Sequence, residues 1–294
     1  MVKKIPIPFN FNTLYEVFPR DLAEKLEKKL IKRYGYNSKI SVLEMIKEQD
    51  GDIKFLAKYI YDKIFKNYTA KQWGIKPEKI DPQVMARVPV YINRDNRYFT
   101  DKYQYVPKEG YTKMIERMLS SPNIKIMLNT DFKELIKIDS KHKKIYFQNK
   151  EFKGKLIFTG MIDELFHFKY GYLQYRSLNL KFEIKEKEYY QESAVINYPN
   201  NYKFTRITEF KHIHPVKSNK TIILKEYPKK YKPNKDIPYY PVFTKDSQEQ
   251  YIKYKREAEK FENLNLVGRL AEYKYYDMDD VIKKALEIFE EMIK

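Results

Sequence analysis

KLIFTG, residues 155–160, is the stretch that says most about the fold. An unbroken run of three apolar residues followed by Thr159 and Gly160 is typical of a buried parallel strand that ends in a tight turn. Ligands of open α/β sheets bind at the carboxyl ends of such strands. The stretch therefore indicates an α/β fold.

Helices are predicted on the N-terminal side of this strand. Apolar residues recur there at helical spacing, so we expect at least three amphipathic helices to pack together before Tyr68. The residues that share a helical face are Leu22, Leu26 and Leu30, and then Ile53, Leu56, Ile60 and Ile64. The spacing of a capping box, which starts a helix, occurs at Thr13 with Glu16 and at Ser41 with Glu44.

Short strands are predicted from residue 87 onward, where the pattern changes to short β-branched and aromatic runs. They cover residues 87–92, 97–107, 124–128 and 143–148, with a helix over residues 111–119. Further along, the alternation in residues 204–211 places Arg206 on a strand face with the aromatic residues Phe204 and Phe210.

Two histidines follow this strand. His212 and His214 would share one strand face, which is the arrangement of two metal ligands. No third ligand accompanies them, so we prefer a structural or surface role and expect no metal.

A last helix is predicted over residues 277–294. Its apolar residues at helical spacing are Val281, Ile282, Ala285, Leu286, Phe289 and Ile293. The free amides and the macrodipole at its N-terminus favour an anionic or electron-rich ligand group, and Arg269 lies shortly upstream.

The composition excludes several classes of function. The 294 residues contain no cysteine, which excludes disulfides and thiolate chemistry, and no apolar run has the length of a membrane span. We therefore expect a cytoplasmic protein. The net charge of +18 is spread along the chain among 40 acidic residues, so mixed-charge surfaces are a better interpretation than nucleic-acid binding. Such a charge can still attract an anionic substrate.

The common catalytic motifs are absent from this sequence. It contains no GxGxxG, GxxxxGK, GxSxG or HExxH. Tyrosines and arginines are plentiful, and together they supply the aromatic face and the charged donors that a nucleoside diphosphate needs. The same residues are also common in cores and interfaces. The residue types alone leave both interpretations open.

Several phrases resemble the prokaryotic UDP-galactopyranose mutases, and they follow one another in that family's order. The resemblance runs from about Ile5 to the end of the chain. It is carried by YTAKQWG (68–74), RVPV (87–90), TGMIDELF (159–166), AVINYP (194–199), KFTRITEFKH (203–212), PYYPV (238–242) and GRLAEYKYYDMDDVIKKAL (268–286).

The resemblance implies an enzyme that interconverts UDP-galactopyranose and UDP-galactofuranose with reduced FAD. In that family the flavin N5 attacks the anomeric carbon and UDP leaves, so that the sugar ring opens and recloses. By resemblance, Arg87 and Arg206 hold the diphosphate and free the leaving group. The expected ligands are therefore UDP-galactose, UDP and FAD.

The same resemblance implies roles for further residues. Tyr68 and Thr69 would line the uridine site with Trp73 nearby, and Asn197 would touch ribose or sugar. The phosphates would accept hydrogen bonds from Tyr98, Tyr240 and Tyr275. The flavin contacts would come from Arg269, Tyr276, Asp277, Met278 and Asp279, where the helix N-terminus faces the pyrimidine carbonyl.

Family members begin with a βαβ unit that carries GxGxxG, and this sequence departs from them there. The resemblance therefore implies an incomplete Rossmann-like FAD-binding domain (111–178 and 257–294), an inserted helical substrate lobe (12–86) and an antiparallel sheet domain (87–110 and 179–243). Without its neighbours, the strand at KLIFTG would leave apolar surface exposed.

The departure leaves alternatives for the chain. The missing unit would be encoded upstream, be supplied by a separate FAD-binding polypeptide, or have been cut away. A non-catalytic UDP or UDP-sugar binding protein and a non-functional gene fragment are alternatives to an enzyme. A homo-oligomer is a further open alternative.

Overall fold

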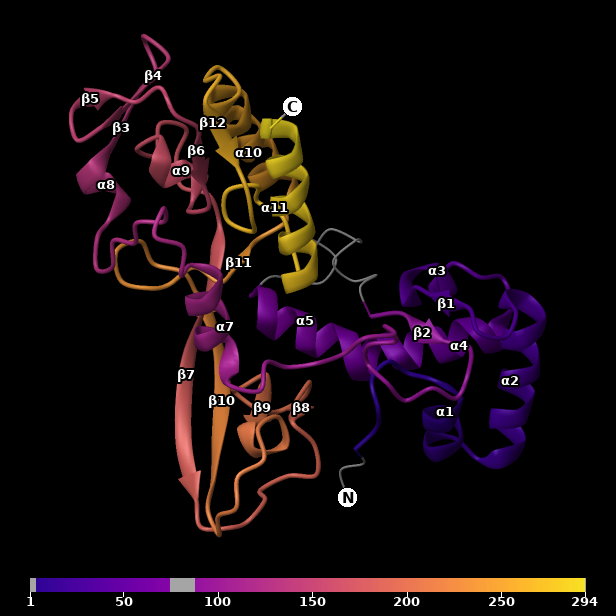
Figure 1. Ribbon diagram of the computed structural model, residues 1–294. Helices are drawn as coiled ribbons and strands as arrows, with labels where there is room; N and C mark the ends of the chain where they lie inside the picture. Colours follow the sequence, from indigo (N-terminus) through magenta and orange to yellow (C-terminus); the bar gives the residue numbers. More distant parts are fainter. Residues whose placement is uncertain (1–3, 75–87, 294) are drawn as a thin grey trace. The chain divides into compact units, whose positions relative to one another are not determined.

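A computed structural model describes residues 4–74 and 88–293 of the chain (Figure 1). The chain divides into two compact units. Unit 1 contains Met1–Met114 and Asn179–Pro228, and unit 2 contains Ile115–Leu178 and Lys229–Lys294. Both units are therefore discontinuous in sequence. The three-part division expected from the sequence stays a prediction.

The helices of unit 1 form the core that the sequence predicts. They are α1 (Phe11–Val17), α2 (Arg20–Tyr34), α3 (Val42–Ile46), α4 (Gly51–Ile60) and α5 (Lys66–Trp73), and a π-helical turn (Tyr61–Phe65) precedes α5. The buried face of α2 contains Leu26 and Leu30, and that of α4 contains Ile53, Leu56 and Ile60. The predicted helical faces and their mutual packing are confirmed.

The start of one helix agrees with the predicted caps, and the start of another does not. Ser41 is the N-cap of α3 as expected, but its Oγ accepts the Leu43 N–H at 3.3 Å, whereas a capping box would use the Glu44 N–H. The start predicted at Thr13 is wrong, because α1 begins at Phe11 and Asn10 Oδ1 accepts the Thr13 N–H at 3.1 Å. The Asn10 side chain also donates to Asp95 O at 2.9 Å, and this distant partner fixes Asn10 as the cap.

Within residues 4–74 and 88–293, the strands form one larger sheet and three small ones. The larger sheet has the order β11-β7-β10-β9-β8, and its β9–β10, β8–β9 and β7–β11 pairs are antiparallel. Its strands are β7 (Tyr175–Lys185), β8 (Val195–Asn197), β9 (Arg206–Glu209), β10 (Thr221–Lys230) and β11 (Tyr240–Pro241). Along β9 the residues Ile207 and Glu209 are buried while Arg206 and Thr208 are half-buried. The alternation predicted for this strand is thus confirmed.

Other predictions around these strands are wrong or fall partly outside the described residues. Residues 97–107 and 124–128 form no strand. Tyr103 and Tyr105 are 71% and 87% exposed, and an extended segment is a stable strand only where a partner pairs with it. Of residues 87–92, β2 covers Val90–Tyr91 and pairs with β1 (Lys39–Ile40). The predicted helix at 111–119 is confirmed as α7 (Gly110–Met118).

The two histidines do not lie on a strand. Residues Phe210–His212 form a 3-10 turn, and His212 Nε2 is 2.8 Å from Gln191 O. The shared strand face predicted for His212 and His214 is therefore wrong, because the chain turns immediately after β9.

Unit 2 contains the parallel strand that KLIFTG predicts. β6 (Leu156–Phe158) pairs in parallel with β12 (Leu264–Leu266). Phe158 is buried, whereas Ile157, which points to the opposite face, is 50% exposed. The parallel pairing is confirmed, and burial holds for one face only.

The remaining elements are α8 (Phe132–Leu135), β3 (Ile136–Asp139), β4 (Lys144–Phe147), β5 (Lys150–Glu151), α9 (Ile162–Leu165), α10 (Lys245–Ala258) and α11 (Met278–Ile293).

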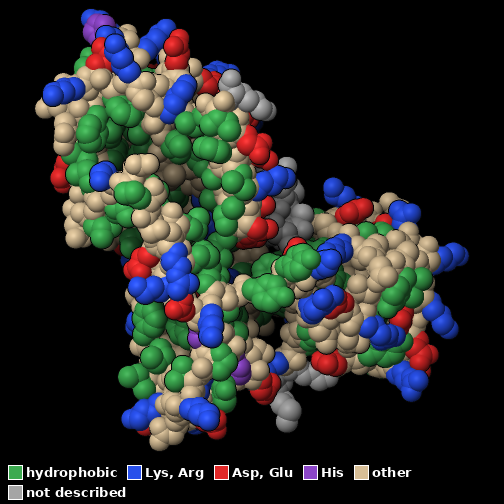
Figure 2. Space-filling model, viewed as in Figure 1, with side chains coloured by type: hydrophobic (Ala, Val, Ile, Leu, Met, Phe, Trp, Pro, Cys, Tyr) green, Lys and Arg blue, Asp and Glu red, His purple; other side chains and the backbone are tan. Residues whose placement is uncertain are grey.

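The last helix, α11, lies where it is predicted, but its apolar stripe is exposed. Met278, Ile282, Leu286, Phe289 and Ile293 are between 54% and 67% exposed. Figure 2 shows hydrophobic side chains on the surface of the region that contains α11 in Figure 1. No helix within residues 4–74 and 88–293 is long and apolar enough to cross a bilayer.

A buried carboxyl group links α9 to the sheet within unit 2. Asp163 is buried, and it accepts hydrogen bonds from the Leu173 N–H at 2.9 Å and from the Tyr175 hydroxyl at 3.3 Å. Burial raises the pKa of Asp163 to about 6, because desolvation disfavours the carboxylate.

This raised pKa predicts a pH dependence of stability. The folded protein favours protonated Asp163, so its contribution to the unfolding free energy should fall as pH rises from about 4 to about 6, by roughly 2–3 kcal/mol. Asp163→Asn removes this titration. Urea unfolding across that range should show the wild type losing stability relative to Asp163→Asn, while the exposed Asp246→Asn follows the wild type. A difference that does not change with pH would contradict the assignment.

Candidate functional site

Helix α5 carries the three residues expected at a uridine site. Thr69 and Trp73 are four residues apart and are each 7% exposed, so they lie on the buried side of α5. Tyr68 is half-buried. Gly74 ends the helix with φ at 65°, and its N–H donates to Ala70 O at 2.9 Å. The helix therefore ends directly after Trp73.

Arg206 lies at the centre of the candidate cluster in unit 1. On β9 it is directly opposite Asn197 of β8 and Glu226 of β10. Its Nη2 donates to the Tyr68 hydroxyl at 2.8 Å, and its Nε lies 3.6 Å from Glu226 Oε2. Burial raises the pKa of Glu226, and the charge of Arg206 opposes this shift. The structure thus brings together three predicted residues: Tyr68, Asn197 and Arg206.

This cluster has the chemistry of an anion site. A guanidinium presents N–H donors in a rigid planar fork that matches the oxygens of a phosphate. Next to it, Asn197 Oδ1 is buried and accepts no hydrogen bond from the described residues. A buried acceptor without a donor is costly, so this oxygen is suited to a ligand hydroxyl.

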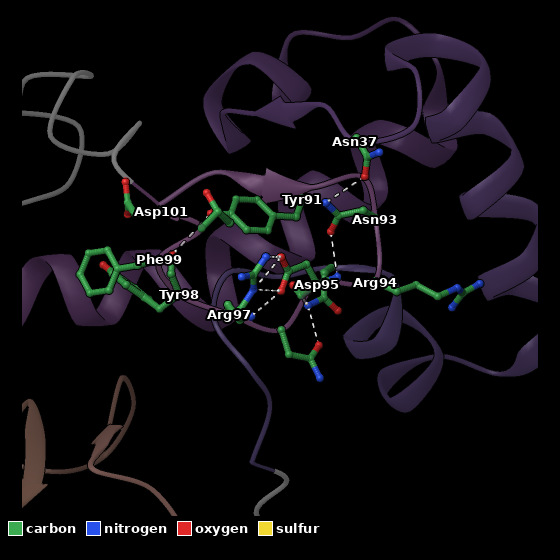
Figure 3. A network of polar contacts seen from close by, with 12 residues as sticks. Asn37, Tyr91, Asn93, Arg94, Asp95, Arg97, Tyr98, Phe99 and Asp101 are labelled. Atoms are coloured by element: carbon green, nitrogen blue, oxygen red, sulfur yellow. Dashed lines mark hydrogen bonds and ion pairs between the residues drawn. The ribbon is translucent and has the colours of Figure 1, made fainter. Parts of the chain in front are cut away.

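Tyr98 is positioned by a separate polar network that follows β2 (Figure 3). Arg97 donates to both oxygens of Asp95, at 3.0 Å from Nε to Oδ1 and 2.7 Å from Nη2 to Oδ2, and this pairing lowers the pKa of Asp95 to about 2. The Tyr98 carbonyl accepts from the Tyr91 hydroxyl at 3.5 Å, and its exposed ring packs edge-on against Phe99. The other predicted arginine, Arg87, lies outside the described residues.

The second cluster lies in unit 2 and is built around Arg269. Its guanidinium carbon is 4.5 Å from the ring centroid of Tyr275 and 5.4 Å from that of Tyr240. These two rings are stacked, with centroids 5.7 Å apart and planes inclined by 8°. Arg269 also donates to the backbone carbonyls of Tyr239 and Tyr276. Arg269 thus fixes the backbone around three of the predicted residues.

The N-terminus of α11 adjoins this cluster in sequence, and it is rich in carboxylates. Asp277, Asp279 and Asp280 are exposed, and Asp280 Oδ2 accepts the Asp277 N–H at 3.1 Å. First-turn amides such as those of Met278 and Asp279 lack intrahelical acceptors. The carboxylates disfavour an anion there, so the donor set fits a neutral electron-rich group. The carbonyl edge of a flavin ring is such a group. The pyrophosphate of FAD needs a different site, a glycine-rich turn, and residues 1–294 contain no GxGxxG motif for it.

Comparisons with known proteins agree on one family. The family model of UDP-galactopyranose mutase matches residues 63–275. A dTDP-fucopyranose mutase of Escherichia coli is 32% identical over 290 residues, which are 98% of this chain and 74% of that protein. The chain belongs to the UDP-galactopyranose mutase family. A UDP-galactopyranose mutase of Mycoplasma genitalium is also 32% identical, over 97% of this chain and 72% of that protein.

A solved mutase structure agrees in fold. The crystal structure of a reduced UDP-galactopyranose mutase superposes with a TM-score of 0.63 at 15% identity, over 94% of this chain and 72% of that one. This agreement confirms the predicted mixed α/β class. The family model and the relatives confirm the family and the isomerase class. The residue roles stay predictions.

Sequence reasoning missed two residues of the candidate cluster in unit 1. Glu226 belongs to it because of its register opposite Arg206, which local sequence does not specify. Lys71 belongs to it because it contacts the loop between β8 and β9. The sequence offered one indication of this position: Lys71 follows Tyr68 by three residues, and residues three apart share a helical face.

The stacked arrangement around Arg269 predicts that its planar guanidinium is required. Arg269→Lys keeps the charge but loses the flat stacking surface and the fork of donors, so unit 2 should lose about 1–2 kcal/mol of unfolding free energy. Urea unfolding should show this loss, whereas Arg256→Lys on the exposed side of α10 should change little. Equal effects of the two variants would contradict the role given to the stack.

Proposed function

We propose that this chain interconverts the pyranose and furanose forms of UDP-galactose when a reduced flavin is bound. The observation that carries the proposal is the arrangement of Arg206, Tyr68 and Asn197. It combines a phosphate-binding fork with a buried oxygen suited to a hydroxyl. Family membership supports it, because all three residues lie within the matched residues 63–275.

The proposed roles in unit 1 follow from the donors and acceptors. Arg206, together with Arg87, would bind the diphosphate and stabilise the charge that develops on the departing UDP. Tyr68 would orient the Arg206 fork through its hydroxyl, and Glu226 would hold the other edge of the guanidinium. Asn197 would accept a hydrogen bond from a ribose or sugar hydroxyl.

Further contacts are proposed for the remaining predicted residues. Thr69 and Trp73 of α5 would shape the uridine site from their buried side of the helix. Tyr98, Tyr240 and Tyr275 would donate to the phosphates.

A flavin would be held by Arg269, Tyr276 and the first turn of α11 with Asp277, Met278 and Asp279. When bound in reduced form, it supplies the nucleophile for the anomeric carbon. Arg269 would support the ring site by fixing the Tyr276 backbone, and the first-turn amides would donate to a ring carbonyl. We propose that the pyrophosphate of FAD is bound by a glycine-rich βαβ segment other than residues 1–294, in the same or a separate polypeptide.

A second candidate substrate has support from one relative. The Escherichia coli relative is a dTDP-fucopyranose mutase, and its identity of 32% equals that of the Mycoplasma genitalium UDP-galactopyranose mutase. The proposed diphosphate contacts do not distinguish the two nucleotides.

Turnover of UDP-galactofuranose and dTDP-fucofuranose should therefore be compared, with FAD and dithionite present and with the glycine-rich segment added or omitted. Faster turnover of the dTDP-sugar would overturn the substrate assignment.

The Arg206 fork predicts a specific loss of activity. Arg206→Lys keeps the charge but loses the planar fork, so UDP affinity should fall about tenfold and turnover about 100-fold. Calorimetry with UDP and the reduced-flavin assay measure the two effects, and Arg20→Lys at the exposed start of α2 is the matched control. UDP binding without turnover would favour a non-catalytic binding protein, and absence of both from the wild type would exclude the proposed function.

A further inference from the structure

Lys71 of α5 occupies an unusual position next to the cluster in unit 1. Its Nζ donates to the backbone carbonyls of Asn200 at 3.1 Å, Tyr202 at 3.2 Å and Phe204 at 3.2 Å, and also to that of Tyr198. An ammonium group has three N–H donors, so four carbonyl oxygens surround three protons. The loop thus wraps around the Lys71 ammonium as a ring of carbonyl oxygens wraps around a metal cation.

The loop that supplies these carbonyls connects two residues of the candidate site. Residues 198–205 join β8, which ends at Asn197, to β9, which begins at Arg206. The two residues lie directly opposite each other, and the Tyr198 N–H donates to Thr205 O at 2.8 Å just beyond them. Any movement at the base of this loop therefore moves Asn197 and Arg206 relative to each other.

Helix α5 holds both the loop and the strand that follows it. Tyr68, one turn before Lys71, accepts the hydrogen bond from Arg206. Asn67 Nδ2 donates to Asn200 Oδ1 at 3.1 Å. Within the loop, the rings of Tyr198, Tyr202 and Phe204 pack on one another with centroids 4.8–5.3 Å apart. Ring packing makes the loop compact, and the polar contacts attach it to α5.

We propose that Lys71 is a positioning residue that fixes the loop 198–205 against α5 and thereby sets Asn197 and Arg206 in place for the nucleotide sugar. The inference rests on the proposed function, because it concerns the same site. Lys71 acts through the backbone carbonyls to which it donates. Its role is to keep Asn197 Oδ1 and the Arg206 guanidinium at a fixed position relative to each other. This matters because a displacement of about 1 Å at such groups costs up to about 100-fold in rate.

A second lysine provides a matched control. Lys211 is buried, and its Nζ donates to the backbone carbonyls of Glu188, Ser218 and Lys220. The chemistry is the same, but none of the predicted site residues belongs to the segments that it joins. Lys211→Met should therefore lower stability as Lys71→Met does, without a matching loss of ligand affinity.

The test uses Lys71→Met, Lys71→Arg and Lys211→Met in the full chain. Lys71→Met should raise KM for UDP-galactofuranose and weaken UDP binding, each about tenfold or more, because the site is displaced rather than removed. Lys71→Arg keeps a cation with several donors and should recover most of the affinity. Lys71→Ala with added propylammonium should regain part of it. Near-UV circular dichroism identifies any variant that fails to fold.

The loop itself can be followed without any enzymatic activity. Chymotrypsin cleaves after aromatic residues that are not followed by proline, and Tyr202 and Phe204 are such sites in the loop. Cleavage there should be several-fold faster in Lys71→Met than in the wild type and in Lys211→Met. Unchanged cleavage, or unchanged UDP affinity in Lys71→Met, overturns the proposal. A wild type that binds no UDP overturns the proposed function instead, and the cleavage rate still decides whether Lys71 holds the loop.

Discussion

The hydrogen bond between the Arg206 guanidinium and the Tyr68 hydroxyl is the contact on which the candidate site of unit 1 depends. It joins helix α5 to strand β9, although the two residues are 138 positions apart in sequence. A partly buried guanidinium needs partners to offset its lost hydration, and it finds an acceptor in the Tyr68 hydroxyl and an opposite charge in Glu226, 3.6 Å away. Their positions on α5 and β10 in turn fix the direction of the fork. Helix packing and strand register together thus position the group that we propose binds a diphosphate.

Periodicity predicted the parts of the fold that depend on local sequence. Leu26 and Leu30 of α2 and Ile53, Leu56 and Ile60 of α4 are buried as their spacing required, because helical geometry alone decides which residues share a face. The same holds for the alternation along β9 and for the parallel strand at KLIFTG. The family resemblance was also available from the sequence, since it depends on the order of short phrases and not on their contacts.

The predictions that failed depended on partners far away in the chain. Residues 97–107 alternate like a strand, but Tyr103 and Tyr105 are exposed, and strand propensity without a pairing partner does not make a sheet. The cap of α1 is Asn10 and not the predicted Thr13, because the Asn10 side chain is fixed by its hydrogen bond to Asp95 O. Glu226 and Lys71 were missed for the same reason. The role of Glu226 comes from strand register, and that of Lys71 from backbone carbonyls that carry no sequence pattern.

The two clusters differ in charge, and this difference favours different proposed ligands. In unit 1 Arg206 contacts the Tyr68 hydroxyl and the Glu226 carboxylate, and Lys71 donates to backbone carbonyls. Two neighbouring cations favour a ligand with negative charge. In unit 2 the cation Arg269 is stacked on Tyr240 and Tyr275 and donates to carbonyls, while exposed carboxylates line the first turn of α11. Those carboxylates already complement the helix dipole, so a second anion would be repelled there. A charged diphosphate therefore suits the surroundings of Arg206, and a neutral ring that accepts hydrogen bonds suits the first turn of α11.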